Sequence, residues 1–190
     1  MLYLSTKLHN QPLLSLRSAG RIGTVIGPII NPHNLHIDGF YCDVINAESE
    51  QILLDMHIRD MGVKGFIIDD HTNLSDPDEL VRLQPVIEMD FELIGKQAFV
   101  GKKKIGKIVD YAIDSDGLFI NKFYVQPPVW QSLNQSTLIF DRLSVVEVTD
   151  TAISFSGPEV TSGVTKALRA AKKELELSPD YSASASEISE

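Results

Sequence analysis

One segment of 35 residues occurs twice in this chain, and this duplication constrains the fold more than any other feature. Residues 8–42 read LHNQPLLSLRSAGRIGTVIGPIINPHNLHIDGFYC, and residues 91–125 read FELIGKQAFVGKKKIGKIVDYAIDSDGLFINKFYV. With a constant offset of 83 positions, the two segments align without a gap. The aligned pairs include Ile22 with Ile105, Gly23 with Gly106, Leu35 with Leu118, Ile37 with Ile120, and Phe40 with Phe123. Such a repeat indicates that one structural unit is built twice.

Each copy has the pattern of a β-hairpin. Residues 21–30 alternate as a strand that Gly23 interrupts, and Gly106 interrupts the second copy at the matching position. Glycine inside a strand marks a bulge or a tight corner, so we expect both glycines to be structural. The turn of the second copy is Asp114-Ser115-Asp116-Gly117, where Gly117 and its neighbours suit a tight reversal. The sequence therefore predicts an all-β fold.

The later strands correspond at a larger offset. The first copy closes with Gly65–Asp69, and its counterpart is Ala152–Phe155, so the offset has grown to 87. We therefore expect an insertion in the connection Gln126–Leu133 of the second copy.

These patterns predict four regions: a first repeat at residues 1–75, a linker at 76–89, a second repeat at 90–157 and a C-terminal segment at 158–190. Each repeat is close to the lower size limit of a stable domain, so we expect the two to pack together. In the linker, Asp76-Pro77 predicts the start of a short helix and Pro85 its end.

The C-terminal segment has a different texture. Apolar residues from Val160 to Leu175 recur at helical spacing with basic residues between them, and Ser178–Glu190 is mostly Ser, Ala and Glu. We expect a short helix followed by a disordered tail. The helix has three open roles: docking on the repeats, lying on an anionic membrane surface, or recruiting a partner.

Composition places the chain among ordinary globular proteins, with 43% apolar and 23% charged residues. Cys42 is the single cysteine, which excludes an internal disulfide. The first residues lack the apolar core of a signal peptide, and the chain has no run of ~18 apolar residues that would span a bilayer. We therefore expect a cytoplasmic protein without a membrane span.

The net charge of −9 is unevenly distributed. Residues 1–88 hold six Lys and Arg against twelve Asp and Glu, whereas residues 89–157 hold seven against eight. An acidic chain repels phosphate at long range, so any contact with nucleic acid would be local.

The second hairpin resembles the PRC-barrel family. The likeness rests on Gly106-Lys107-Ile108-Val109, on the turn Asp114–Gly117, and on Phe123–Pro128 after it. This family, named after the H subunit of the photosynthetic reaction centre, also supplies the C-terminal domain of a bacterial ribosome maturation factor. The resemblance covers roughly residues 8–70 and 91–157. It implies two small tandem β-barrels that act as a binding or adaptor module, without a family-wide catalytic residue.

Two clusters of side chains raise the question of a metal. His33, His36, Asp38 and Cys42 lie close in sequence, but their spacing matches no standard zinc pattern, and the second copy lacks all four. The aspartates at 110, 114 and 116 lack the glutamate that ends a calcium loop. We interpret both clusters as turn and surface residues, and we expect no metal and no cofactor.

Two features of the second copy are candidate contacts for a partner. Lys102, Lys103 and Lys104 form a basic hairpin tip, which is either a solvated loop or a contact for RNA phosphate or an acidic partner. Trp130 follows Pro127-Pro128 and either caps the open end of the barrel or anchors an interface.

No nucleophile elbow, Gly-rich phosphate loop or dinucleotide fingerprint occurs in the sequence. We therefore expect a non-catalytic cytoplasmic adaptor that binds a protein partner. The alternative is a factor associated with the ribosome or with RNA. A third class, an enzyme acting on a small molecule, stays open because paired β units can form a cleft between them.

Overall fold

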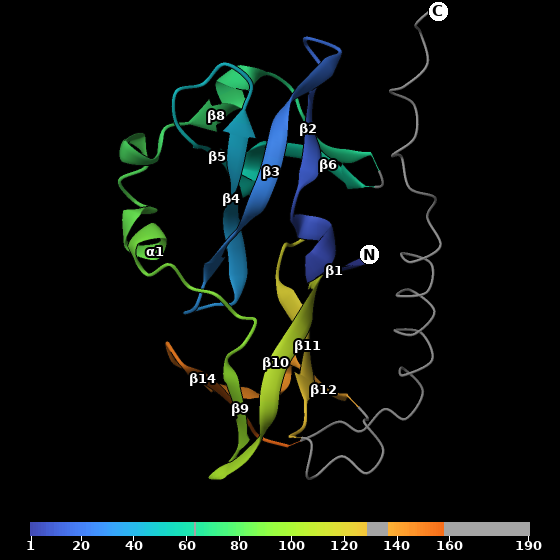
Figure 1. Ribbon diagram of the computed structural model, residues 1–190, viewed down its shortest axis with the longest axis vertical. Helices are drawn as coiled ribbons and strands as arrows, with labels where there is room; N and C mark the ends of the chain where they lie inside the picture. The colour runs from blue at the N-terminus through green and yellow to red at the C-terminus, as the bar shows by residue number, and fades with distance from the viewer. Residues whose placement is uncertain (63, 129–136, 158–190) are drawn as a thin grey trace, which may run out of the picture. The chain divides into compact units, whose positions relative to one another are not determined.

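The computed structural model describes residues 1–62, 64–128 and 137–157, and Met1–Glu159 form one compact unit. The described chain is all-β, as predicted, with two sheets (Figure 1). In sheet order, the first sheet consists of β6 (Ile58–Gly62), β7 (Gly65–Ile68), β2 (Gln11–Ser15), β3 (Gly20–Asn31), β4 (His36–Val44), β5 (Gln51–Leu54) and β8 (Leu74–Ser75). The second consists of β13 (Val145–Val148), β14 (Ala152–Phe155), β9 (Gln97–Val100), β10 (Lys103–Asp114), β11 (Ile120–Gln126) and β12 (Leu138–Asp141), with β1 (Leu2–Leu4) paired to β10.

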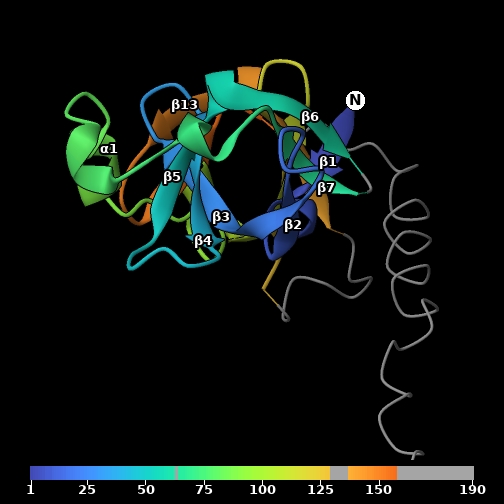
Figure 2. The same cartoon turned by 90° about the horizontal axis from the view of Figure 1, so that it is seen from above.

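The two sheets share one strand order. The path β6-β7-β2-β3-β4-β5 of the first sheet matches β13-β14-β9-β10-β11-β12 of the second. In each, a long hairpin forms the centre, and the sheet contains one parallel pair, β2 with β7 in the first and β9 with β14 in the second. Seen from above, the strands of the first sheet curve strongly around the core (Figure 2). The duplication read from the sequence is therefore a duplication of strand topology.

The strand registers test the alignment of the copies. Pro28 pairs with Phe40, and Tyr111 pairs with Phe123, which confirms the offset of 83 in the central hairpin. Phe40 also pairs with Leu53, and Phe123 with Phe140, so the offset is 87 from that strand onward.

The gap-free alignment is wrong in the first strand. Leu13 pairs with Gly23, but Ala98 pairs with Gly106, so β2 and β9 correspond at an offset of 85. The reason is the length of the connection, because Leu16–Ala19 joins β2 to β3 whereas only Gly101 and Lys102 join β9 to β10.

The two strand glycines occupy corners where a side chain does not fit. A Cβ on Gly23 would lie 2.4 Å from the Asp43 carbonyl oxygen, and one on Gly106 would lie 2.1 Å from the Gln126 carbonyl oxygen. Both lie next to a register shift between their strand and its partner, the geometry of a β-bulge. At Gly117 the turn is less crowded, since a Cβ there would lie 3.3 Å from the Phe119 ring.

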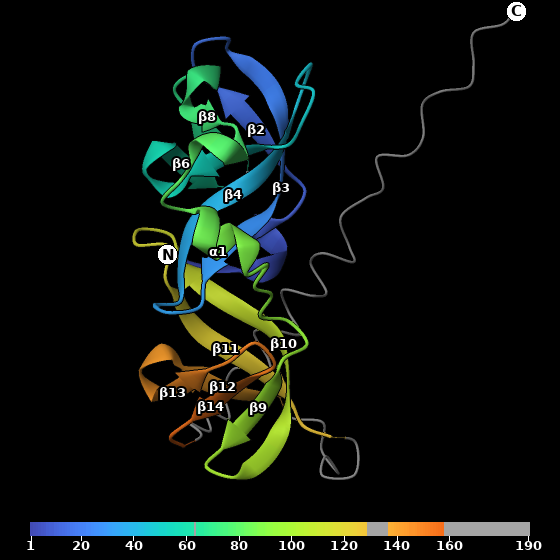
Figure 3. The ribbon, with the colours of Figure 1, turned by 90° about the vertical axis from the view of Figure 1, so that its left-hand side faces the viewer.

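The core is apolar and extends through both repeats. Phe40, Phe66, Phe123, Phe140 and Phe155 are among its largest buried side chains. Phe40 packs edge-on against Phe66, and Phe140 stacks on Phe155. A smaller cluster joins Ile29, Ile52 and Leu83 on the other face of the first sheet, where helix α1 (Gln84–Glu88) packs (Figure 3).

The two central hairpins meet through equivalent residues. The Ile37 amide donates to the Leu118 carbonyl at 3.0 Å, and the Ile120 amide donates to the Leu35 carbonyl at 2.9 Å. Leu35 and Leu118 both have positive φ, 58° and 49°. Since these residues are related by the offset of 83, the contact is approximately twofold symmetric.

Short 3-10 helices connect the strands: η1 (Ser5–Leu8), η2 (Asp55–His57), η3 (His71–Asn73), η4 (Pro77–Glu79) and η6 (Arg142–Ser144). Pro77 lies in the first turn of η4, as predicted. The expectation for Pro85 is wrong, because it lies in the first turn of α1 and begins that helix. Proline is compatible with this position since the first helical amides have no partner within the helix.

Within the described residues, no helix has the length and apolar character needed to cross a bilayer. The predictions for Trp130 and for the segment 158–190 fall outside the described residues.

Candidate functional site

The basic tip predicted from the sequence is the turn between β9 and β10. Gly101 has φ +56° at this turn, and Lys103 pairs with Val100 just after it. Lys102, Lys103 and Lys104 are all exposed. The structure thus presents the three lysines together at the end of the second sheet.

A fourth lysine, Lys107, lies on the face of β10 that points away from the core. Lys107 is exposed and Val109 is 44% exposed, because the buried Gly106 and Ile108 alternate with them. Across the ladder, Lys104 pairs with the half-buried Phe99 of β9. Lys103 pairs with Val100, which packs on the core, so Lys103 leaves β10 on the opposite side from Lys104 at the exposed end of the strand. We call the set Phe99, Lys102, Lys103, Lys104 and Lys107 the basic face. In the part of the chain that the structure describes, its four lysines form no ion pair or side-chain hydrogen bond.

Further apolar side chains lie near the basic face. Phe99 of β9 pairs with Ser154 of β14, which pairs with Glu147 of β13. The register shift next to Glu147 places Val146 in a bulge, where it is 68% exposed. The second sheet therefore carries two exposed aliphatic groups, Val109 on β10 and Val146 on β13, and the exposed Glu147 follows Val146.

Pro127 and Pro128 follow the end of β11 and are half-buried. Gln126 pairs with Lys107, and the chain leaves β11 antiparallel to β10, in the direction of Lys104. The prolines therefore lie towards the end of the sheet that carries the basic face. Trp130 is outside the described residues.

The corresponding end of the first sheet has its cations paired. The Arg17 guanidinium forms an ion pair with Asp70, and Arg59 Nε lies 3.0 Å from Asp69 Oδ1. Arg21, the counterpart of Lys104, donates from Nε to the Gly23 carbonyl at 3.0 Å. The hydrogen bond from Arg17 is the largest influence on the pKa of Asp70 and lowers it, against an opposing effect of burial.

The residues considered for metals have other partners. His36 Nδ1 lies 2.7 Å from Asp38 Oδ1, and Cys42 is buried, which raises the pKa of its thiol to about 12. Asp110 accepts from the Ser5 hydroxyl at 2.5 Å and from the Tyr111 amide at 2.7 Å. Among the described residues, no group of three His, Cys, Asp or Glu side chains converges as a metal site requires.

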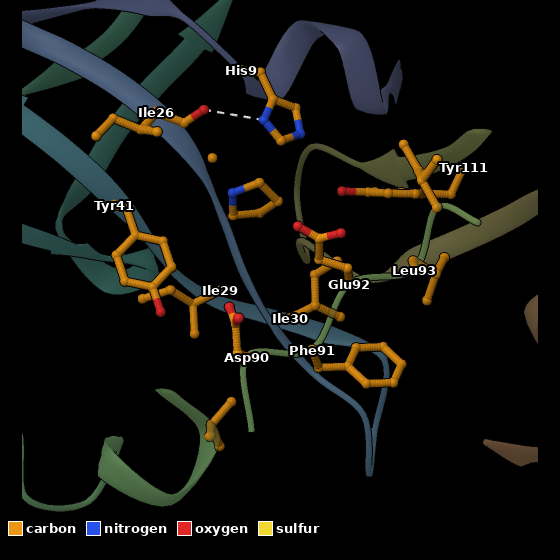
Figure 4. A pocket seen from close by; sticks show the side chains of 14 residues that line it. His9, Ile26, Ile29, Ile30, Tyr41, Asp90, Phe91, Glu92, Leu93 and Tyr111 are labelled. Atoms are coloured by element: carbon orange, nitrogen blue, oxygen red, sulfur yellow. Dashed lines mark hydrogen bonds between the residues drawn. The ribbon is translucent and has the colours of Figure 1, made fainter. Parts of the chain in front are cut away.

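A pocket of about 360 Å³ opens where β3, β10 and the segment after α1 come together (Figure 4). Its size is in the range of small-molecule sites. Its walls are mainly apolar and include Ile26, Ile29, Ile30, Val86, Phe91 and Leu93.

Two polar side chains reach the pocket from its inner walls. Tyr111 is 2% exposed, its hydroxyl points into the pocket, and it forms no hydrogen bond with a described residue. Burial raises the pKa of Tyr111, and the Asp110 charge raises it further. His9 Nδ1 lies 3.1 Å from the Ile26 carbonyl oxygen. When Nδ1 carries the proton and donates to that oxygen, Nε2 is an acceptor.

Acidic groups line the outer part of the pocket. Asp90 and Glu92 are exposed, and neither forms an ion pair within 4.0 Å of a described residue. Figure 4 shows the Glu92 carboxylate on the side of the Tyr111 hydroxyl, and Asp90 on the side of Tyr41. Burial raises the pKa of Tyr41, and the negative charges of Asp90 and Glu50 add to the rise. Within the described part of the chain, no lysine or arginine lines the pocket.

The sequence analysis left a cleft between the copies open but did not identify these residues. One available signal was divergence between the repeats: at an offset of 83, Pro28 corresponds to Tyr111, and both line the pocket. His9 and Asp90 gave no such signal, since they lie in connections whose path depends on tertiary packing.

Comparisons with models of known protein families and with curated proteins each find no match for this chain.

Proposed function

We propose that this chain is a non-catalytic binding module that holds a cytoplasmic protein partner on the basic face of its second repeat. The observation that carries the proposal is the set of four exposed lysines without ion pairs, beside Phe99 and the exposed Val109 and Val146. Unpaired charges and exposed apolar groups on one sheet suit a partner that offers acidic and apolar side chains together.

A protein partner fits this face better than RNA for two reasons. The net charge of −9 weakens the attraction of an extended polyanion, whereas a short acidic segment meets only the local lysines. The exposed aliphatic groups Val109 and Val146 add nothing to phosphate binding but add contact area with a protein. Binding to RNA or to a ribosomal subunit is the competing outcome of the test below.

We also propose that both repeats are PRC-type barrels. The shared strand order, the long central hairpin and the glycine corners support this assignment. By analogy, a fold of this type serves to bind other macromolecules, which agrees with an adaptor function.

The test compares two charge-matched variants of the full chain in capture from native lysate with quantitative mass spectrometry. One variant carries K102E, K103E and K104E on the basic face. The control carries K7E, K64E and R82E, which change the same charge at exposed positions elsewhere. We expect the amount of captured partner to fall at least about tenfold with the first variant and to stay unchanged with the control.

Nuclease treatment of the same samples separates the partner classes. Capture of one protein that survives nuclease, depends on the three lysines and is reproduced with the purified partner supports the proposal. Capture abolished by nuclease would identify RNA as the ligand. Equal loss in both variants would attribute the effect to net charge, and either result would overturn the proposal.

A further inference from the structure

The pocket beside Tyr111 is separate from the basic face, and its chemistry is different. Its walls are mainly apolar, and among the described residues that line it the only carboxylates are Asp90 and Glu92, with neither a lysine nor an arginine. From this arrangement we infer that the pocket binds a small organic cation, a protonated amine carried on a compact apolar body.

The Tyr111 hydroxyl is the strongest indication of a ligand. Among the described residues, no buried side-chain oxygen or nitrogen lacks a hydrogen-bond partner, so the Tyr111 hydroxyl oxygen is open to the space of the pocket. The Tyr111 side chain is 2% exposed, and its hydroxyl points into the pocket. A ligand with N–H donors would satisfy this oxygen.

The other polar groups favour a donor over an acceptor. Glu92 and Asp90 accept only, and His9 Nε2 accepts when Nδ1 donates to the Ile26 carbonyl. An ammonium group has three donors and no acceptor, so it matches this set, while a carboxylate or phosphate would face the negative charges of Asp90 and Glu92. The Lys96 ammonium is close enough to Glu92 for the two charges to interact, but it is not among the described residues that line the pocket. It lies 4.1 Å from the Phe91 ring centroid and donates to the Asp150 carbonyl.

The apolar walls define the rest of the ligand. Ile26, Ile29 and Ile30 come from β3, Val86 comes from α1, and Phe91 and Leu93 come from the segment after it. A pocket of about 360 Å³ with such walls accommodates a small aromatic or branched aliphatic group. The cation has two sources, a free amine or a lysine side chain of a peptide, and the test includes both.

Nuclear magnetic resonance of the full chain with labelled tyrosine rings reports on the pocket directly, because the protein contains only five tyrosines. The probes are 2-phenylethylamine, its neutral analogue 2-phenylethanol, its anionic analogue 3-phenylpropanoate, and the capped peptide acetyl-Leu-Lys-Leu-amide. We expect the amine to shift the Tyr41 and Tyr111 signals in a saturable way and to leave Tyr3 unchanged. The alcohol should bind about tenfold more weakly, and the acid weaker still.

Variants test the roles of the side chains. Glu92→Gln should raise the Kd of 2-phenylethylamine about tenfold, whereas Glu88→Gln, an exposed glutamate outside the pocket lining, should leave it unchanged. Tyr111→Phe should weaken binding about fivefold while the protein melts at the same or a higher temperature. Weaker binding without a lower melting temperature would show that the hydroxyl contacts the ligand and does not stabilise the folded protein.

The peptide identifies the source of the cation. Tighter binding of the peptide than of the amine at the same tyrosines would assign the pocket to a partner's lysine, and tighter binding of the amine would assign it to a free metabolite. Absence of saturable shifts at Tyr111 up to about 20 mM of either cation would overturn the inference. Equal affinity for amine and alcohol, or a Kd that Glu92→Gln does not change, would also overturn it.

Discussion

At the end of the first sheet, the cations are paired within the repeat. Arg17 binds Asp70, Arg59 binds Asp69, and Arg21 donates to the backbone beside Gly23. At the matching end of the second sheet, Lys102–Lys104 and Lys107 have no such partner among the described residues. The two sheets share one strand order, so the repeats differ here in the contacts of their surface cations and not in their topology.

The comparison indicates which positions a duplicated fold can vary. Positions that build the frame stay alike: Gly23 and Gly106 allow a close backbone approach, and Phe40 and Phe123 fill the core. Positions on the surface differ in their contacts: Arg21 donates to the Gly23 carbonyl, whereas Lys104 forms no side-chain hydrogen bond or ion pair with a described residue. Our proposal places partner binding on the second repeat because Lys102–Lys104 and Lys107 form no ion pair with a described residue.

The largest expected effect tests the shared core. Phe40→Ala and Phe123→Ala each remove a ring that is 0% exposed, so each should lower the free energy of unfolding by about 3–5 kcal/mol. Urea denaturation measures both. A loss in one repeat with no loss in the other would show that the copies do not share an equivalent core.

The glycine corners should respond next. Gly23→Ala and Gly106→Ala force a Cβ to within 2.4 and 2.1 Å of a carbonyl oxygen, so each should destabilise the fold by about 2–3 kcal/mol. The control is Gly62→Ala, because a Cβ there meets no atom within 4 Å. Tolerance of alanine at either corner would contradict the shared geometry.

Cys42 offers a substitution that makes the first repeat resemble the second, where Val125 occupies the matching position. Burial raises the pKa of the Cys42 thiol from 9.0 to about 12, so above pH 9 the unfolded chain loses this proton before the folded chain does. The free energy of unfolding therefore falls as pH rises from 9 towards 12, by up to about 1.4 kcal/mol per pH unit from this group.

Cys42→Val should remove that contribution, so the variant should resist alkaline unfolding better than the wild type while differing little at pH 7. The buried tyrosines lose their protons in both proteins, so the difference between the two denaturation profiles isolates the thiol. Identical profiles from pH 7 to 11 would contradict the burial of Cys42.

The smallest effect concerns the paired cations. Asp70 has a lowered pKa, so its contribution to stability is present above its ordinary value of 3.8 and is lost as pH falls through the lower folded-state value. Arg17→Ala should move acid unfolding to a higher pH, whereas Lys103→Ala should leave it unchanged. Circular dichroism during acid titration measures both, and an equal shift for the two variants would remove the contrast between the repeats.

Much of the frame was predictable from the sequence. The duplication, the hairpins, the glycine corners and the insertion after Gln126 follow from apolar periodicity and turn residues, which are local properties. The strand register of β2 was not, because the different loop lengths at Leu16–Ala19 and Gly101–Lys102 shift the pairing by two residues. The prediction for Pro85 was also wrong. A proline ends a helix when it lies in the interior but is compatible with the first turn, where Pro85 lies in α1.

The candidate sites divide in the same way. The exposure of Lys102–Lys104 was predictable because a hairpin tip is exposed wherever the hairpin forms, while their role in binding stays a prediction. The pocket was not, because it brings together His9, Asp90, Glu92 and Tyr111 from elements far apart in the sequence. Only the packing of the two repeats and of the segment after α1 places these side chains around one space.

The proposal that the second repeat and not the first holds a partner can be tested most directly by photo-crosslinking from one matched pair of positions. Phe99, which pairs with Lys104, corresponds to Leu14, which pairs with Arg21, and both side chains are half-buried. A photoreactive phenylalanine analogue at each site would be activated in lysate, and crosslinked proteins identified by mass spectrometry. The account predicts one prominent protein adduct from position 99 and none from position 14. Adducts of equal yield from both, or from position 14 alone, would contradict it.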